Sequence, residues 1–290
     1  MSSLLADTLH TEDIIALPRA QGSLKVSFKQ SGGKTKLDRL YQQGCLKARF
    51  PNLEPKALKE GVMINTAGGL TDGDDIYQKI RWGKQTSACM TTQAAERIYL
   101  SRQDNATINT KLVVEEEAMA YWLPQETILF DGGRFVRNNQ VEVAAGGRLL
   151  ATESLIFGRS AMNEQVISGH VFDSWRIKYD NQLVFADGFS LSDNMADCLQ
   201  NKIIAHGAKA IATLIYAGED AASVEAYLKT QTSGLEYEQT YLGSSLLPKI
   251  LHIRILSENP EYMRLALMKL ISKIMAHIDE THILPRVWLC

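Results

Sequence analysis

Acidic side chains are the groups in this sequence whose type and spacing come closest to a chemical site. Asp72, Asp74 and Asp75 cluster in a glycine-rich turn. A calcium-binding EF-hand loop needs acids or amides at alternate positions followed by glycine, and residues 72–77 do not meet that pattern. Two carboxylates on a β scaffold could instead form a hydrolase or lyase pair, but many of the 33 acidic residues would satisfy this requirement. An enzyme of that kind stays open as an alternative.

Histidine and cysteine do not form a recognisable metal-binding spacing. Only His277 and His282 lie close together in the sequence. On a continuous helix they would point about 140° apart, so joint ligation of a metal needs the helix to end between them. Otherwise they are expected at a solvated helix terminus. The cysteines lack CxxC spacing and are expected to be buried thiols. They are Cys45, Cys89, Cys198 and Cys290.

Several common functions lack their sequence signatures. There is no GxxxxGK[ST] phosphate loop, because Gly33-Lys34-Thr35 follows Phe28 where the first glycine is needed, and no GxSxG nucleophile elbow, HExxH zinc pair or GxGxxG dinucleotide loop. A formal net charge of −2 argues against a nucleic-acid partner, which requires a clustered basic face. Residues 1–17 show no signal-peptide pattern, and no stretch of about 20 apolar residues could cross a membrane. We therefore expect a cytoplasmic protein without nucleic-acid or membrane partners.

Two segments combine polar and bulky apolar residues in an unusual way. Residues 91–99 (TTQAAERIY) carry hydrogen-bonding side chains on both faces of an expected strand. Residues 122–130 (WLPQETILF) place Gln125 and Glu126 between large apolar groups. Polar groups in such surroundings are either paired inside the protein or line a channel. Internal pairing is the favoured interpretation.

Alternation of apolar and polar residues dominates the chain from residue 20 to residue 190. It is clear at residues 24–29 and 175–179, where every second side chain would face a core. Asp-Gly and Gly-Gly turn signals recur at short intervals, and residues 180–181 (DN) indicate a tight hairpin. We expect a mainly β fold with many short, largely antiparallel strands in packed sheets. The fixed repeat period of a β-solenoid is not visible.

Helical spacing begins after residue 192. Helices are expected over residues 193–207, 218–230 and 259–278, and strands over residues 210–216 and 250–256. Most of the few helices thus fall in the C-terminal third. We expect one domain over residues 1–290, with a β-rich part at about 20–190 and a mixed α/β part at about 191–290.

The last helix has the clearest start signal, with Asn259 as N-cap and Pro260 at the first helical position. Its apolar residues spread over more than half of its circumference. We expect this helix to pack into the core. Alternatively, its apolar surface around Ile274 and Ile278 could receive a partner protein.

Four segments, taken in order, resemble the UreD family of urease accessory proteins, called UreH in some bacteria. They are residues 65–74 (NTAGGLTDGD), 91–99, 122–130 and 157–164 (FGRSAMNE). The resemblance runs from about Gly22 to residues 284–288. The sequence departs from the usual family pattern at Asp72 and Asn163, where the family commonly has glycine.

The resemblance implies a predominantly β scaffold that is not an enzyme and that serves urease maturation. Members of that family bind the helical accessory protein UreF, which recruits the GTPase UreG, and the assembly docks on the urease apoprotein to insert nickel. The missing phosphate loop agrees with this division of labour, because GTP hydrolysis belongs to the partner. The resemblance implies no permanently bound cofactor and only a transient association with nickel.

Three acids lie in or beside the matching motifs: Asp74, Asp131 and Glu164. Ni²⁺ accepts carboxylate, imidazole and water ligands, and a transfer route must bind the ion weakly enough to release it. Sparse acids suit this requirement better than a tight cluster. We therefore hypothesise that these three acids line a transient route for nickel.

Overall fold

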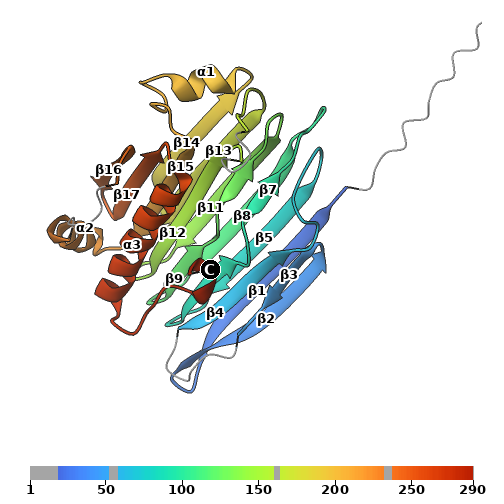
Figure 1. The fold of residues 1–290 in the computed structure, drawn as a ribbon. Coiled ribbons are helices and arrows are strands. Elements are labelled where there is room, and N and C mark those ends of the chain that lie inside the picture. The colour runs from blue at the N-terminus through green and yellow to red at the C-terminus, as the bar shows by residue number, and fades with distance from the viewer. Residues whose placement is uncertain (1–18, 52–57, 160–163, 232–236, 290) are drawn as a thin grey trace, which may run out of the picture.

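Two β-sheets lie face to face and contain most of the chain (Figure 1). The computed structural model describes residues 19–51, 58–159, 164–231 and 237–289, so residues 1–17, residues 160–163 of the fourth motif, and Cys290 lie outside the described residues. The first sheet has the strand order β14 (Gln182–Ser192), β13 (His170–Tyr179), β11 (Arg134–Val143), β8 (Ala106–Val114), β5 (Asp75–Trp82), β1 (Gln21–Ser31) and β2 (Lys34–Gly44). The second has the order β16 (Thr240–Leu247), β17 (Ile250–Ser257), β15 (Ala210–Ala217), β12 (Arg148–Phe157), β9 (Met119–Leu123), β6 (Ser87–Thr92), β4 (Lys59–Asn65) and β3 (Leu46–Arg49). Two short strands, β10 (Thr127–Leu129) and β7 (Glu96–Ile98), attach to it through β12.

The alternating pattern forms these sheets because each strand buries one face. In β1, Leu24, Val26 and Phe28 are buried, whereas the residues between them are partly or fully exposed. The buried faces of both sheets meet in one apolar core. Asp180 and Asn181, with φ of 49° and 62°, form the expected tight turn between β13 and β14. The mainly β fold predicted from the sequence is confirmed.

The direction of the central strands corrects our expectation of largely antiparallel pairing. β5, β8, β11 and β13 pair in parallel in the first sheet, and β4, β6, β9 and β12 do so in the second. The chain passes from one sheet to the other between these strands, so each sheet receives successive strands in the same direction. Most of the glycine turns are therefore crossings between sheets, as at Gly146-Gly147 between β11 and β12, whereas Gly32-Gly33 closes the β1–β2 hairpin within one sheet.

This winding has no constant repeat length, which explains why no period is visible in the sequence. Thr110 in β8 lies opposite Gln78 on one side, 32 residues away, and opposite Asn139 on the other, 29 residues away. Antiparallel pairs flank the parallel strands, as in β1–β2, β3–β4, β13–β14 and β15–β17. Only the path of the chain through the two sheets determines which neighbouring strands are parallel and which are antiparallel.

Helix α3 (Pro260–Ile278) packs with α2 (Ala221–Thr230) on the outer face of the second sheet (Figure 1). Its start is as expected, since the Asn259 side chain accepts a hydrogen bond from the Glu261 backbone N–H (2.9 Å). No helix in the described ranges is long and apolar enough to span a bilayer.

The apolar surface of α3 is used inside the fold. Ile274 is completely buried and Ile278 packs against the same core cluster. The expectation of core packing is therefore confirmed, and the alternative of an exposed partner-binding surface on this helix is wrong. The helix covers strands that would otherwise expose an apolar outer face.

Helix α1 (Met195–Gln200) is shorter than the helix predicted over residues 193–207. The chain leaves the helix at Asn201, whose side chain accepts a hydrogen bond from the Ile203 backbone N–H (2.9 Å). This local side-chain bond competes with helical hydrogen bonding. Helical spacing of apolar residues alone could not reveal that competition.

Candidate functional site

Asp74 ties two segments together at the turn before β5. Its side chain is buried, and its oxygens accept hydrogen bonds from the backbone N–H groups of Ala20 (2.6 Å) and Thr71 (2.8 Å). Asp72, where the family commonly has glycine, accepts a hydrogen bond from the backbone N–H of Gln103 (3.2 Å). Both carboxylates therefore stabilise the loops in which they lie.

Asp131 and Glu164 are neighbours in the structure. Oδ1 of Asp131 accepts hydrogen bonds from the backbone N–H groups of Ile167 (2.8 Å) and Ser168 (3.0 Å). Glu164 forms an ion pair with Arg159 (2.7 Å) and accepts a hydrogen bond from the Asp131 backbone. The hydrogen bond from Arg159 holds the pKa of Glu164 below its usual value. Both carboxylates are partly exposed.

The two C-terminal histidines have separate aromatic partners. His277 stacks on Tyr227 with ring centroids 4.3 Å apart. Nδ1 of His282 lies 2.7 Å from the hydroxyl of Tyr121, and burial lowers the pKa of this histidine. Within the described residues, no group of three or more His, Cys, Asp or Glu side chains could hold a metal ion.

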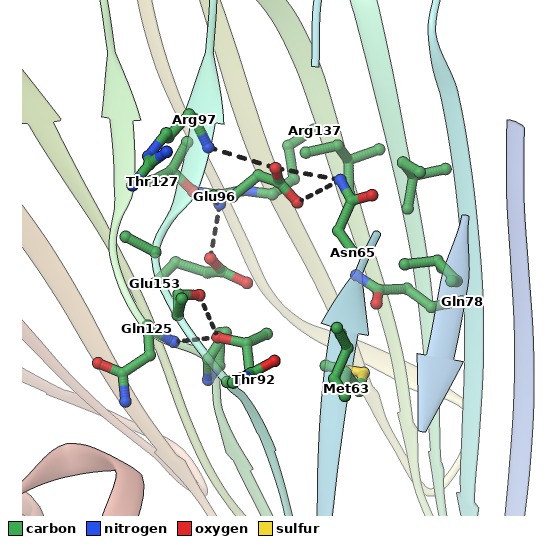
Figure 2. Close-up of a pocket in the computed structure, with 18 of the residues that line it drawn as sticks. Met63, Asn65, Gln78, Thr92, Glu96, Arg97, Gln125, Thr127, Arg137 and Glu153 are labelled. Carbon is green, nitrogen blue, oxygen red and sulfur yellow. Dashed lines mark hydrogen bonds and ion pairs between the residues drawn. The ribbon is translucent and has the colours of Figure 1, made fainter. Parts of the chain in front are cut away.

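A cavity of about 210 Å³ lies between the two sheets (Figure 2). Segments 91–99 and 122–130 supply much of its polar lining, together with side chains from β4, β5, β11 and β12. Asp74, Asp131 and Glu164 are not among the lining residues. The polar lining residues are Asn65, Gln78, Thr92, Gln93, Glu96, Arg97, Gln125, Thr127, Arg137 and Glu153.

Glu96 is one of two carboxylates that line the cavity. Its oxygens lie 3.1 and 3.0 Å from the amide nitrogen of Asn65, which donates to them across the cavity wall (Figure 2). The backbone N–H of Arg97 donates to the same carboxylate (3.2 Å). Burial raises the pKa of Glu96 in spite of these hydrogen bonds.

The second carboxylate, Glu153, belongs to a buried charge cluster centred on Arg137. Nη1 of Arg137 lies 2.6 Å from Glu153, and Nε and Nη2 donate to both oxygens of Asp173 (3.1 and 2.6 Å). Nη1 also donates to the hydroxyl of Thr127 (2.9 Å), and the indole N–H of Trp122 donates to Glu153 (3.1 Å). Because Arg137 comes from one sheet and Glu153 from the other, the guanidinium links the two sheets.

The cluster contains one positive charge and two carboxylates. Burial raises the pKa of Glu153 to about 7, although Arg137 opposes this shift. Burial lowers the pKa of Arg137, but Asp173 and Glu153 outweigh this effect and hold it above its usual value. The excess of negative charge favours the uptake of a proton or another cation at this wall of the cavity.

Replacement of Glu153 by glutamine is expected to weaken the pH dependence of stability. The pKa of Glu153 rises from 4.5 to about 7 on folding, so the folded state binds the proton more tightly and its stability falls as pH rises through this window. The variant lacks this titration. Chemical denaturation at several pH values between 4.5 and 8 measures the slope, and equal slopes for both proteins would contradict the assignment.

Residues 122–130 are also paired internally on the side that faces α3. Arg264 donates a hydrogen bond to Gln125 (2.7 Å) and forms an ion pair with Glu126. The same guanidinium donates to the carbonyl of Trp288 (2.9 Å), whose indole N–H donates to the carbonyl of Leu123 (3.1 Å). Gln125 thus fulfils both interpretations of the sequence, because it is paired internally and also lines the cavity.

Sequence reasoning identified the segment of Glu96 but missed Arg137, Asp173 and Glu153. The available signal was strand parity, since Arg137 shares the buried side of β11 with Phe135 and Val141. A charge at a core-facing position requires a buried partner. Glu153 had no such signal, because every residue of β12 from 149 to 155 is buried.

Comparison with known proteins agrees with the resemblance seen in the motifs. The family model of the UreD urease accessory protein matches residues 20–289. Urease accessory protein UreD of Rhodopseudomonas palustris is 36% identical over 276 residues, covering 95% of each chain. That of Magnetococcus marinus is 34% identical over 270 residues, 92% of this chain and 93% of the relative. That of Mesorhizobium japonicum is 42% identical over 197 residues, 68% of this chain and 70% of the relative. The chain therefore belongs to the UreD family of urease accessory proteins.

Proposed function

We propose that this chain is a cytoplasmic, non-catalytic scaffold that works with UreF and the GTPase UreG on the urease apoprotein to insert nickel. Family membership supports a role in urease maturation. The absence of a phosphate loop from the sequence supports the finer division of labour, in which a partner hydrolyses GTP. Nickel is the cargo in this proposal and is bound only in passing.

The cavity between the sheets is the observation that supports this proposal most directly. It combines the carboxylates Glu96 and Glu153 with the amide and hydroxyl oxygens of Gln78, Gln125 and Thr127. Oxygen ligands of this kind bind Ni²⁺ less tightly than thiolates or clustered imidazoles, and weak binding permits release. Asp74, Asp131 and Glu164 would serve as further weak ligands along the outer part of the route.

A hydrolase or lyase that uses paired carboxylates is less compatible with this cavity. One oxygen of Glu153 is held by Arg137 and the other by Trp122. Glu96 is likewise engaged by the amide of Asn65. The internal partners of both carboxylates compete with proton exchange with a substrate, although the remaining lone pairs of these oxygens can still contact a passing metal ion.

Neutralising the proposed ligands is expected to lower the nickel content of co-expressed urease by several-fold. The variants are Asp74→Asn, Asp131→Asn, Glu164→Gln and Glu96→Gln, which keep one acceptor oxygen each. Asp74→Asn loses one of its two hydrogen bonds, because Ala20 and Thr71 donate to different oxygens of Asp74. All four variants remove the negative charge that attracts the ion. Nickel per urease active site, measured by elemental analysis of purified urease, is the readout.

Asp180→Asn is the matched control, because Asp180 is an exposed carboxylate in the β13–β14 turn. Co-purification of each variant with UreF, UreG and urease checks that the assembly still forms. Normal nickel content in the three outer variants with an intact assembly would exclude them from the route. The same result for Glu96→Gln would exclude Glu96 as a nickel ligand.

A further inference from the structure

Strand β16 is an exposed sheet edge rich in apolar side chains. Its only strand neighbour among the described residues is β17, so one side of its backbone has no strand partner there. The strand carries no charge, and its large side chains are 41–48% exposed: Tyr241, Leu242, Leu246 and Leu247. A bare apolar edge of this kind is a template for pairing with another strand.

The opposite end of the fold shows how an edge is protected in the same molecule. β2, the edge of the first sheet, exposes Leu40 and Tyr41 to a similar extent. It also carries four charged residues: Lys34, Lys36, Asp38 and Arg39. Charged residues on an edge strand disfavour pairing with another chain. β16 lacks this protection, which indicates that its edge is covered in solution.

The sequence of β16 indicates which chain covers this edge, because it has nearly the same pattern of large and small residues in both directions. Residues 241–247 are Tyr-Leu-Gly-Ser-Ser-Leu-Leu, with two large apolar residues on each side of a small centre at Ser244. A two-fold axis perpendicular to a sheet pairs residues symmetrically about one position. With Ser244 on the axis, Leu242 lies opposite Leu246 of a second copy, and Tyr241 lies opposite Leu247.

We propose that β16 pairs in antiparallel fashion with β16 of a second copy, about a two-fold axis at Ser244. Leu242 and Leu246 share the face on which their β17 partners Ile255 and Leu251 contact the helices. Tyr241 and Leu247 lie on the other face. The symmetric register therefore covers the exposed apolar side chains of both faces at once, and it joins the second sheets of the two copies into one.

A cysteine at Ser244 is expected to form a disulfide across the axis under mild oxidation. Directly opposed residues in an antiparallel pair have Cα atoms about 4.5–5.5 Å apart, which a disulfide can bridge. Ser245→Cys is the matched control, since in this register its two copies are more than about 7 Å apart. Non-reducing electrophoresis, with the unmodified protein run in parallel to account for native cysteines, measures the covalent dimer. Equal cross-linking at both positions would overturn the register.

Leu246→Lys is expected to shift the purified protein from dimer to monomer in analytical ultracentrifugation. The charge lies on an exposed edge, so the thermal midpoint of unfolding of the variant should match that of wild-type protein diluted until it is monomeric. Leu40→Lys on the edge of β2 is the control and should remain dimeric. A monomeric wild-type protein at all accessible concentrations would overturn the proposal. The proposal would also be overturned if the β16 edge of the wild-type protein were covered only when a different protein is bound.

Discussion

Replacement of Arg137 by methionine is expected to lower the free energy of unfolding by about 3–5 kcal/mol. The guanidinium contacts Glu153 and both oxygens of Asp173 inside the core and is only 3% exposed. Methionine fills much of the same volume but leaves two buried carboxylates without their cation. Because the cluster joins the two sheets, the loss should appear in the global unfolding transition measured by chemical denaturation.

The deficit of this variant should depend on pH in a defined direction. Loss of the cation raises the pKa of Glu153 further, so the folded variant binds this proton more tightly than the unfolded chain. The stability of the variant therefore falls as pH rises, and the difference from wild type is larger at pH 8 than at pH 5. Arg39→Met, at a side chain that is 90% exposed, should change stability by less than about 0.5 kcal/mol. A pH-independent deficit would contradict the role assigned to the cluster.

Replacement of Trp288 by alanine is expected to cost about 3–5 kcal/mol and to release the C-terminal segment. Trp288, in the short 3₁₀ helix η2 (Arg286–Trp288), is 1% exposed and donates a hydrogen bond to Leu123. Its ring lies 5.1 Å below the guanidinium carbon of Arg264, which also contacts Gln125 at the cavity wall. The variant therefore loses a packed aromatic ring and one anchor of the segment that ends next to the cavity.

Two measurements separate local release from general loss of stability. Thermal unfolding reports the global effect, and digestion by a carboxypeptidase under native conditions reports release of the C-terminal residues. Leu289→Ala is the matched control. The side chain of Leu289, next to Trp288 in the sequence, is 68% exposed, so its removal should change neither result. A Trp288→Ala variant as stable and as resistant to digestion as wild type would contradict the importance of this contact.

Short-range features of the fold were predictable where a local pattern decides the structure. The N-cap at Asn259 and the turn at residues 180–181 depend on neighbouring residues only, and both occur as expected. The end of α1 was not predictable from spacing, because the Asn201 side chain competes with the helix. Parallel pairing was also missed, since alternation of side chains is the same in parallel and antiparallel strands.

Some residues of the candidate site were likewise predictable from the sequence, and others were not. Glu96 and Gln125 lie in segments that the sequence marked as unusual, because polar groups among bulky apolar residues need partners. The predicted acids Asp74, Asp131 and Glu164 proved to have hydrogen-bond or ion-pair partners inside the protein, and their part in a nickel route stays a prediction. Arg137, Asp173 and Glu153 come together from residues up to 36 positions apart, so no local pattern connects them.

Four properties were readable from the amino-acid sequence: a mainly β protein, its C-terminal helices, its lack of nucleotide-binding motifs and, through four ordered segments, its resemblance to the UreD family. Those properties depend on side-chain periodicity and on short motifs, which are readable along the chain. The parallel winding, the cavity between the sheets and the exposed edge of β16 in the described part of the chain became visible only in the folded protein. These depend on which strands become neighbours, and neighbours in a sheet are chosen by packing across the whole core rather than by the residues beside them.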